Sequence, residues 1–194
     1  MKREEKRQQI MKAAERLFTS RRFHEVRLDE VAGSAGVGKG TIYRYFRDKD
    51  DLFFQTVAAG FDELCALLKR RVPAKAPFLE QLLGVCVQVS RFLDGRRELF
   101  RMMQTEGGRR APARGAFRAM WTEKRKMLVG AVAEVIRSGV AEGEIREDVP
   151  PELLASFLLG MLRTRSHGGG EAPHVLSSHD VVVDVFCRGA SNRE

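Results

Sequence analysis

The sequence of 194 residues contains few of the features that mark membrane-spanning or disulfide-rich chains. Its longest apolar runs, such as ASFLLGML at 155–162, fall well short of the roughly 20 residues that a transmembrane helix requires. Its three cysteines, Cys65, Cys86 and Cys187, are far apart and have apolar neighbours, unlike a disulfide framework or a metal-binding spacing. We therefore expect no membrane span and three buried thiols, with a thiol sensor as the open alternative.

Histidine is also scarce, and the four histidines form no pattern typical of catalysis. None lies in an HExxH sequence, and three of them are in or beside a glycine-rich stretch without metal-ligand spacing. We therefore predict that the protein is not an enzyme and binds no metal or cofactor. A metal sensor built from His174, His179 and Asp180 remains an alternative.

The amino terminus, MKREEKRQQI, mixes both charge signs before any apolar stretch and so lacks the hydrophobic core of a secretory signal. We expect a cytoplasmic protein. The net charge of the chain is +8, and residues 1–51 carry 13 Lys and Arg against nine Asp and Glu. Half of the positive excess thus lies in the first quarter of the chain, which is the part expected to face a polyanion.

Apolar residues recur at helical spacing through most of the chain, which predicts an all-α protein. In the amino-terminal part, Ile10, Ala14, Leu17 and Phe18 predict one amphipathic helix, and short helices follow at 28–35 and 39–46. Gly36 suits the turn between these two because glycine adopts positive φ without steric cost. Two short helices joined by such a turn form a helix-turn-helix.

The remainder is predicted to be helical as well. Helices are expected at 48–71, 78–93, 96–104, 116–141, 151–165 and 178–188, with a loop at 106–115 and a break at 167–173. The last helix is ambiguous because its four valines also favour a strand, although Ser178, Arg188 and Gly189 are typical helix-end residues.

The stretch GVGKGT at 36–41 raises the alternative of a phosphate-binding loop. A nucleoside-triphosphate loop requires the spacing GxxxxGK[ST] after a strand, whereas here no strand precedes and Lys39 is followed by glycine. The spacing excludes that interpretation.

The stretch LDEVAGSAGVGKGTIYRYFRDKDDLF, preceded by an amphipathic helix and followed by helices, resembles the TetR family of transcriptional regulators. The resemblance is specific over residues 8–58 and architectural beyond them. It implies a DNA-binding domain at 1–50 and a helical effector-binding and dimerisation domain at 51–194. Arg27 departs from the family's usual Ser or Thr cap of the second helix.

The resemblance also implies a function: a homodimer, expected to be a repressor, that binds palindromic operator DNA and is released by a small-molecule effector. The expected DNA contacts are Arg27, Lys39, Gly40, Thr41, Tyr43, Arg44, Tyr45 and Lys49. Among them Arg44 is the candidate for reading guanine, and Lys39 and Lys49 are candidates for phosphate contacts. For Tyr45 we prefer packing against the first helix to a DNA contact, because an aromatic residue at the end of such a helix often supports the first helix.

Two further residue sets are expected in the carboxy-terminal domain. The expected effector contacts are Phe61, Leu64, Phe100, Met103, Phe117, Trp121 and Phe157. The expected dimer contacts are Leu154, Phe157, Leu158, Met161, Leu162, Val182, Val185 and Phe186. Apolar residues at helical spacing also form ordinary cores, so a helical DNA-binding protein that has no effector and acts through a protein partner remains the alternative.

Overall fold

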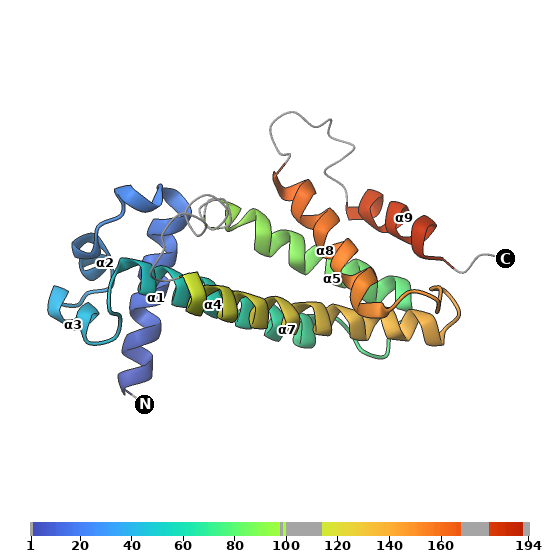
Figure 1. The fold of residues 1–194 in the computed structure, drawn as a ribbon, viewed down its shortest axis with the longest axis horizontal. Helices are drawn as coiled ribbons and strands as arrows, with labels where there is room; N and C mark the ends of the chain where they lie inside the picture. Colours follow the sequence, from blue (N-terminus) through green and yellow to red (C-terminus); the bar gives the residue numbers. More distant parts are fainter. Residues whose placement is uncertain (1, 98, 100–113, 168–178, 192–194) are drawn as a thin grey trace. The chain divides into compact units, whose positions relative to one another are not determined.

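The computed structural model describes residues 2–97, 99, 114–167 and 179–191, and its elements are helical (Figure 1). In chain order the α-helices are α1 (Lys2–Ser20), α2 (Leu28–Ser34), α3 (Lys39–Tyr43), α4 (Lys49–Arg71), α5 (Phe78–Asp94), α7 (Arg114–Ala141), α8 (Pro151–His167) and α9 (His179–Ala190), with a 3-10 turn η1 (Phe23–Glu25) between α1 and α2. Within the described residues there is no strand, and one isolated bridge joins Ile145 and Ser191. The predicted all-α class is confirmed.

The chain divides into two compact units, which are described separately. Unit 1 comprises Met1–Gly60 and Arg96–Thr122, and unit 2 comprises Phe61–Gly95 and Glu123–Glu194. The predicted division at residue 50 concerns function, and it stays a prediction.

The core of unit 1 is built around three aromatic rings. Phe18 of α1, Phe23 of η1 and Phe53 of α4 have ring centroids 5.2–5.8 Å apart, and Phe53 meets the other two edge-on. All three side chains are buried. Large aromatic side chains in edge-to-face contact supply much of the apolar burial of a small unit, and here they fix α1 against the start of α4.

Helix α4 begins where its sequence signals predict. The Asp48 carboxylate accepts a hydrogen bond of 2.7 Å from the Asp51 backbone N–H, which satisfies one free donor of the first turn. The last turn carries Lys69, Arg70 and Arg71, whose charges are favourable at a helix carboxy terminus.

In unit 2, helix α5 packs against both α8 and α9, and α8 packs against α9 (Figure 1). Buried apolar residues from the three helices form this core: Leu82, Val85, Cys86, Val89, Leu154, Leu158, Leu162, Val182 and Phe186. The carboxy-terminal ends of α5 and α8 are joined by Asp94, which accepts hydrogen bonds of 3.0 Å from Arg165 and 2.9 Å from Ser166.

The structure tests several of the helix boundaries predicted from the sequence. Residues 179–190 are helical, so the ambiguous last segment is a helix. Helix α7 begins at Arg114, so the end of the predicted loop at 106–115 is helical, and the rest of that loop lies outside the described residues. Most of the predicted helix at 96–104 and of the break at 167–173 also lies outside them. Among the helices that are described, none is long and apolar enough to cross a membrane.

The predicted thiol burial holds for two of the three cysteines. Cys65 and Cys86 are buried, whereas Cys187 on α9 is partly exposed. Burial raises the pKa of the Cys86 thiol to about 12, so this group stays protonated at neutral pH.

Candidate nucleic-acid interface

Helices α2 and α3 are joined by a glycine turn of defined geometry. Gly36 has φ 61°, its N–H donates to Gly33 O at 3.1 Å, and the Val37 N–H donates to Ala32 O at 3.0 Å. These two bonds form the Schellman motif, which ends a helix with a left-handed residue. The turn therefore requires glycine at position 36, as the sequence predicts.

Helix α3 buries one face and exposes the other. Ile42 and Phe46, at i and i+4, are buried in unit 1, whereas the Tyr43 side chain is 52% exposed. Lys39, Gly40 and Arg44 are also exposed, and Thr41 and Tyr45 are partly exposed. The predicted DNA-contacting residues of α3 and its end therefore belong to one accessible segment.

The amino-terminal end of α2 supplies charged groups beside α3. Lys39 Nζ donates to Asp29 Oδ1 at 2.8 Å, and the Arg27 guanidinium lies 3.8 Å from Asp29 Oδ2. The hydrogen bond from Lys39 holds the pKa of the Asp29 carboxyl below its ordinary value, and the same bond raises the pKa of Lys39. Lys39 is therefore fully charged near neutral pH and is engaged with a carboxylate.

Arg27 takes the helix-capping position that the sequence analysis found unusual for arginine. Its backbone N–H donates to Glu30 Oε2 at 3.0 Å. In a capping box the side chain of the third helical residue accepts such a bond, and Glu30 provides this half of the box. This bond, together with Arg21, lowers the pKa of the Glu30 carboxyl. Glu30 thus anchors the helix start, and the Arg27 side chain is left exposed.

Lys49 lies in a setting that the sequence did not indicate. Its Nζ donates to Phe23 O at 2.8 Å and to Val26 O at 3.0 Å, and it lies 4.4 Å from the centroid of the Phe23 ring. An ammonium group has three protons, and two of them are used by these carbonyls. The arrangement favours a structural role for Lys49, holding η1 against α4, over the predicted phosphate contact.

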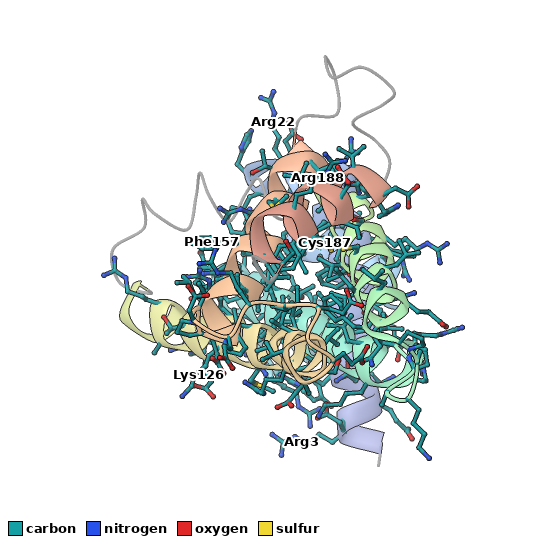
Figure 2. The ribbon with its side chains drawn as sticks, turned by 90° about the vertical axis from the view of Figure 1, so that its right-hand side faces the viewer. Arg3, Arg22, Lys126, Phe157, Cys187 and Arg188 are labelled. Carbon is teal, nitrogen blue, oxygen red and sulfur yellow. The ribbon has the colours of Figure 1, made fainter. Side chains whose placement is uncertain are left out.

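Two cations of α1 were missed by the sequence analysis. Arg3 and Lys6 line an open depression together with Arg44 and Tyr45, and Glu4 and Arg7 border the adjoining part. Tyr45 thus lies beside α1, as the packing interpretation predicts. Figure 2 shows the Arg3 side chain extending from α1. The sequence run KREEKR could have indicated these two residues, because Arg3 and Lys6 are three positions apart and so lie on the same side of a helix. The acidic residues within the run made a cationic surface less evident.

The predicted effector residues are only partly described. Phe61 and Leu64 are buried on α4, with the Phe61 ring centroid 6.1 Å from that of Phe92, and Trp121 is partly exposed. Phe100, Met103 and the side chain of Phe117 lie outside the described residues. The predicted effector set therefore stays a prediction.

The predicted dimer residues fall into two groups. Leu154, Leu158, Leu162, Val182 and Phe186 pack inside the protomer, and Met161 is partly exposed. Phe157 on α8 and Val185 on α9 are 56% and 54% exposed, and Leu153, which the sequence analysis did not select, is 45% exposed. Figure 2 shows Phe157 at the surface of α8. We call these three residues the α8/α9 apolar face.

A metal site is not supported in the part of the chain that the structure describes. No group of three or more His, Cys, Asp or Glu residues is suitably placed there to hold an ion. His174 of the alternative metal sensor lies outside that part.

Comparison with known proteins assigns both parts of the chain. Residues 10–56 match the family model for bacterial regulatory proteins of the tetR family, and residues 72–185 match that for the tetracyclin repressor-like carboxy-terminal domain. The HTH-type transcriptional repressor AcnR of Corynebacterium diphtheriae is 25% identical over 184 residues, which cover 92% of this chain and 90% of that protein.

Solved structures share the fold. The transcriptional regulator FadR from Bacillus subtilis, in complex with stearoyl-CoA, superposes with a TM-score of 0.76 at 22% identity and covers 94% of this chain and 98% of that one. A transcriptional regulator from Saccharomonospora viridis, in complex with choline, has a TM-score of 0.78 at 18% identity and covers 98% and 100% of the two chains.

Proposed function

The chain belongs to the TetR family of bacterial regulatory proteins, and from this premise we propose that it is a homodimeric transcriptional repressor that binds palindromic operator DNA through α3. The observation that carries the proposal is the exposed segment formed by α3 and its end, where Lys39, Tyr43 and Arg44 are accessible while Ile42 is buried and anchors the helix. The major groove admits one helix, and arginine pairs bidentately with guanine. Arg44 is therefore the proposed base-reading residue.

The depression beside α3 extends the proposed contact surface. Arg3 and Lys6 of α1 join Arg44 around it, so three cationic side chains gather where a phosphate oxygen would be accommodated. Phosphate contacts fix the orientation of a reading helix on the duplex without reading sequence. We assign Arg3 and Lys6 this orienting role.

Dimerisation is proposed to use the α8/α9 apolar face. A single short helix contacts few base pairs, and two-fold dimers extend recognition to both halves of a palindrome. Leu153, Phe157 and Val185 are large apolar side chains left exposed on two adjacent helices, which suits a self-complementary contact. The five buried members of the predicted set would support this face from within the protomer.

A small-molecule effector is proposed to bind the carboxy-terminal domain at 51–194 and to lower the affinity of the DNA-binding domain at 1–50. The two solved relatives were crystallised with chemically different molecules, stearoyl-CoA and choline, so the fold does not specify the effector. The residues proposed to contact it are those predicted from the sequence. A protein of the same fold that has no effector and acts through a protein partner is the competing proposal.

The experiment that tests the function is selection of genomic fragments with the purified full-length protein, followed by binding to the recovered site and to a version with one half-site scrambled. The proposal expects a palindrome, two protomers per duplex, and a large loss of affinity for the scrambled site. Recovery of no enriched sequence, with equal affinity for all duplexes, refutes it. Candidate effectors are then titrated against the complex. Release by a small molecule supports the effector, and release only by a protein supports the competing proposal.

Non-catalytic action and a cytoplasmic location are part of the same proposal. The family is defined as regulatory proteins, and AcnR, a relative matched over most of its length, is named as a repressor. A protein that binds chromosomal operators must be in the compartment that contains the chromosome, which in a bacterium is the cytoplasm.

A further inference from the structure

The surface that presents the proposed DNA contacts also carries a carboxylate. Asp29, in the first turn of α2, is 46% exposed, and Lys39, at the start of α3, is 57% exposed. The two side chains are joined by the 2.8 Å hydrogen bond, and Arg27 approaches the other carboxylate oxygen at 3.8 Å. Lys39 and Arg27, which are both expected to contact DNA, thus lie beside the same Asp29 carboxylate.

The capping hydrogen bond at the start of α2 is not made by Asp29. The helix start is held by Glu30, which accepts the Arg27 backbone N–H, whereas the Asp29 oxygens face Lys39 and Arg27. Beside a polyanion, a carboxylate opposes binding through like-charge repulsion, and it competes with phosphate for the same cations.

We propose that Asp29 is an intramolecular competitor of DNA phosphates for Lys39, and that this competition sets the affinity and the salt dependence of the duplex complex. The inference rests on the proposed function. In the free protein Lys39 is held by Asp29, and on the duplex a phosphate oxygen takes the place of that carboxylate. An ion pair between two exposed side chains is weak, so the exchange is possible at small cost.

The test uses four full-length proteins: the wild type, Asp29→Asn, Lys39→Gln and the double variant. Each is titrated with a fluorescent random-sequence duplex of about 30 base pairs, at salt concentrations between about 50 and 200 mM. We expect Asp29→Asn to bind about two- to fivefold more tightly at the lowest salt, which is the range that the strength of an exposed ion pair allows. Its advantage over the wild type should shrink as the salt concentration rises, because salt screens the exposed ion pair that the wild type must break, so its plot of log K against log salt should be steeper.

The double variant separates competition from simple charge removal. If Asp29 acts through Lys39, most of the gain disappears when Asp29→Asn is made in the Lys39→Gln protein. Glu80→Gln, at an exposed position of α5 in unit 2, removes one negative charge from a site that lacks this lysine and is the matched control. The control should change affinity less than Asp29→Asn and leave the slope unchanged.

Three results overturn the inference: weaker or unchanged binding by Asp29→Asn at an unchanged melting temperature, an equal gain in the Lys39→Gln background, or a gain equal to that of Glu80→Gln. If Asp29→Asn lowers the melting temperature, the effect of Lys39→Gln measured in each background still decides, because competition predicts a smaller loss of affinity from Lys39→Gln in the wild type than in Asp29→Asn. A wild type that binds no duplex refutes the proposed function. A wild type that binds while Asp29→Asn has no effect refutes this inference alone.

Discussion

Substitution of Gly139 by alanine tests the packing of unit 2. A Cβ atom at Gly139 of α7 would lie 2.6 Å from Cδ2, 2.7 Å from Cε2 and 2.8 Å from Cγ of Phe78. Non-bonded carbons approach to about 3.5 Å at their optimum, so the ring would have to move by most of an ångström. The ring is buried, and the Phe78 backbone N–H is bonded to Glu142 Oε2 at 3.1 Å, which ties the start of α5 to the end of α7.

The magnitude follows from two opposing effects. Overpacking of a filled core costs about 1–3 kcal/mol, whereas replacing glycine by alanine in a helix gains up to about 1 kcal/mol. The matched control is Gly130→Ala in the same helix, where an added Cβ meets nothing within 4 Å. The helix gain is common to both variants, so the difference in their unfolding free energies should equal the clash, about 1–3 kcal/mol.

Urea unfolding of both variants measures this difference. One fixed protein concentration is used because the proposed dimerisation would add to the stability. Gly139→Ala should have the lower midpoint, and Gly130→Ala should match or exceed the wild type. Adding Phe78→Leu to Gly139→Ala should remove part of the difference, because the ring edge is gone. Equal stabilisation by both alanines would refute the close approach of α5 and α7.

Three further substitutions test the proposed interface and the dimer. Arg44→Ala should bind the selected operator about 10- to 100-fold more weakly, since a bidentate guanine contact is worth about 1–3 kcal/mol. It should bind random duplex nearly as well as the wild type. Equal losses of affinity for both duplexes in anisotropy titrations would show that Arg44 does not read a base. Lys49→Met should lower the melting temperature, because the hydrogen bonds to the Phe23 and Val26 carbonyls are lost. It should leave the slope of log K against log salt for DNA binding unchanged. A slope reduced by about one at an unchanged melting temperature would instead support a phosphate contact by Lys49. Phe157→Glu should shift the protein from dimer to monomer in sedimentation velocity, because a buried unpaired charge is costly in an apolar contact. The control Glu80→Gln should leave assembly unchanged. A dimer that persists in Phe157→Glu would mean that the interface lies elsewhere.

The helix-turn-helix was predictable because its determinants are local. The positive φ of Gly36 and the burial of Ile42 and Phe46 follow from glycine chemistry and from the i, i+4 spacing, both of which are visible in the sequence. The last helix was ambiguous for the opposite reason. Valines at 181–183 and 185 fit a strand or a buried helix equally well, and the contacts of α9 with α5 and α8 decide between them.

The predicted dimer set illustrates a limit of helical periodicity. Leu154, Leu158 and Leu162 repeat at i, i+4 and i+8, and that stripe is the one that packs inside the protomer. Phe157 belongs to a neighbouring stripe, which is exposed. A helix that is apolar on more than one side predicts burial on two sides, but the sequence does not show which side meets the same chain.

The cations near α3 show why residue type alone does not identify a phosphate contact. Lys39 and Lys49 look alike in the sequence, both close to the reading helix. In the structure Lys39 is exposed and held by a carboxylate, which is an oxyanion like a phosphate, whereas Lys49 is partly buried and held by the carbonyls of Phe23 and Val26. Exchange of one anion for another preserves the charge pairing of Lys39, but removal of Lys49 from the two carbonyls breaks both of its hydrogen bonds to the backbone. The partners that each ammonium would have to give up therefore favour Lys39 over Lys49 as the proposed phosphate contact. Arg3 and Lys6 of α1 belong to the proposed interface for a different reason, because they line the depression beside Arg44.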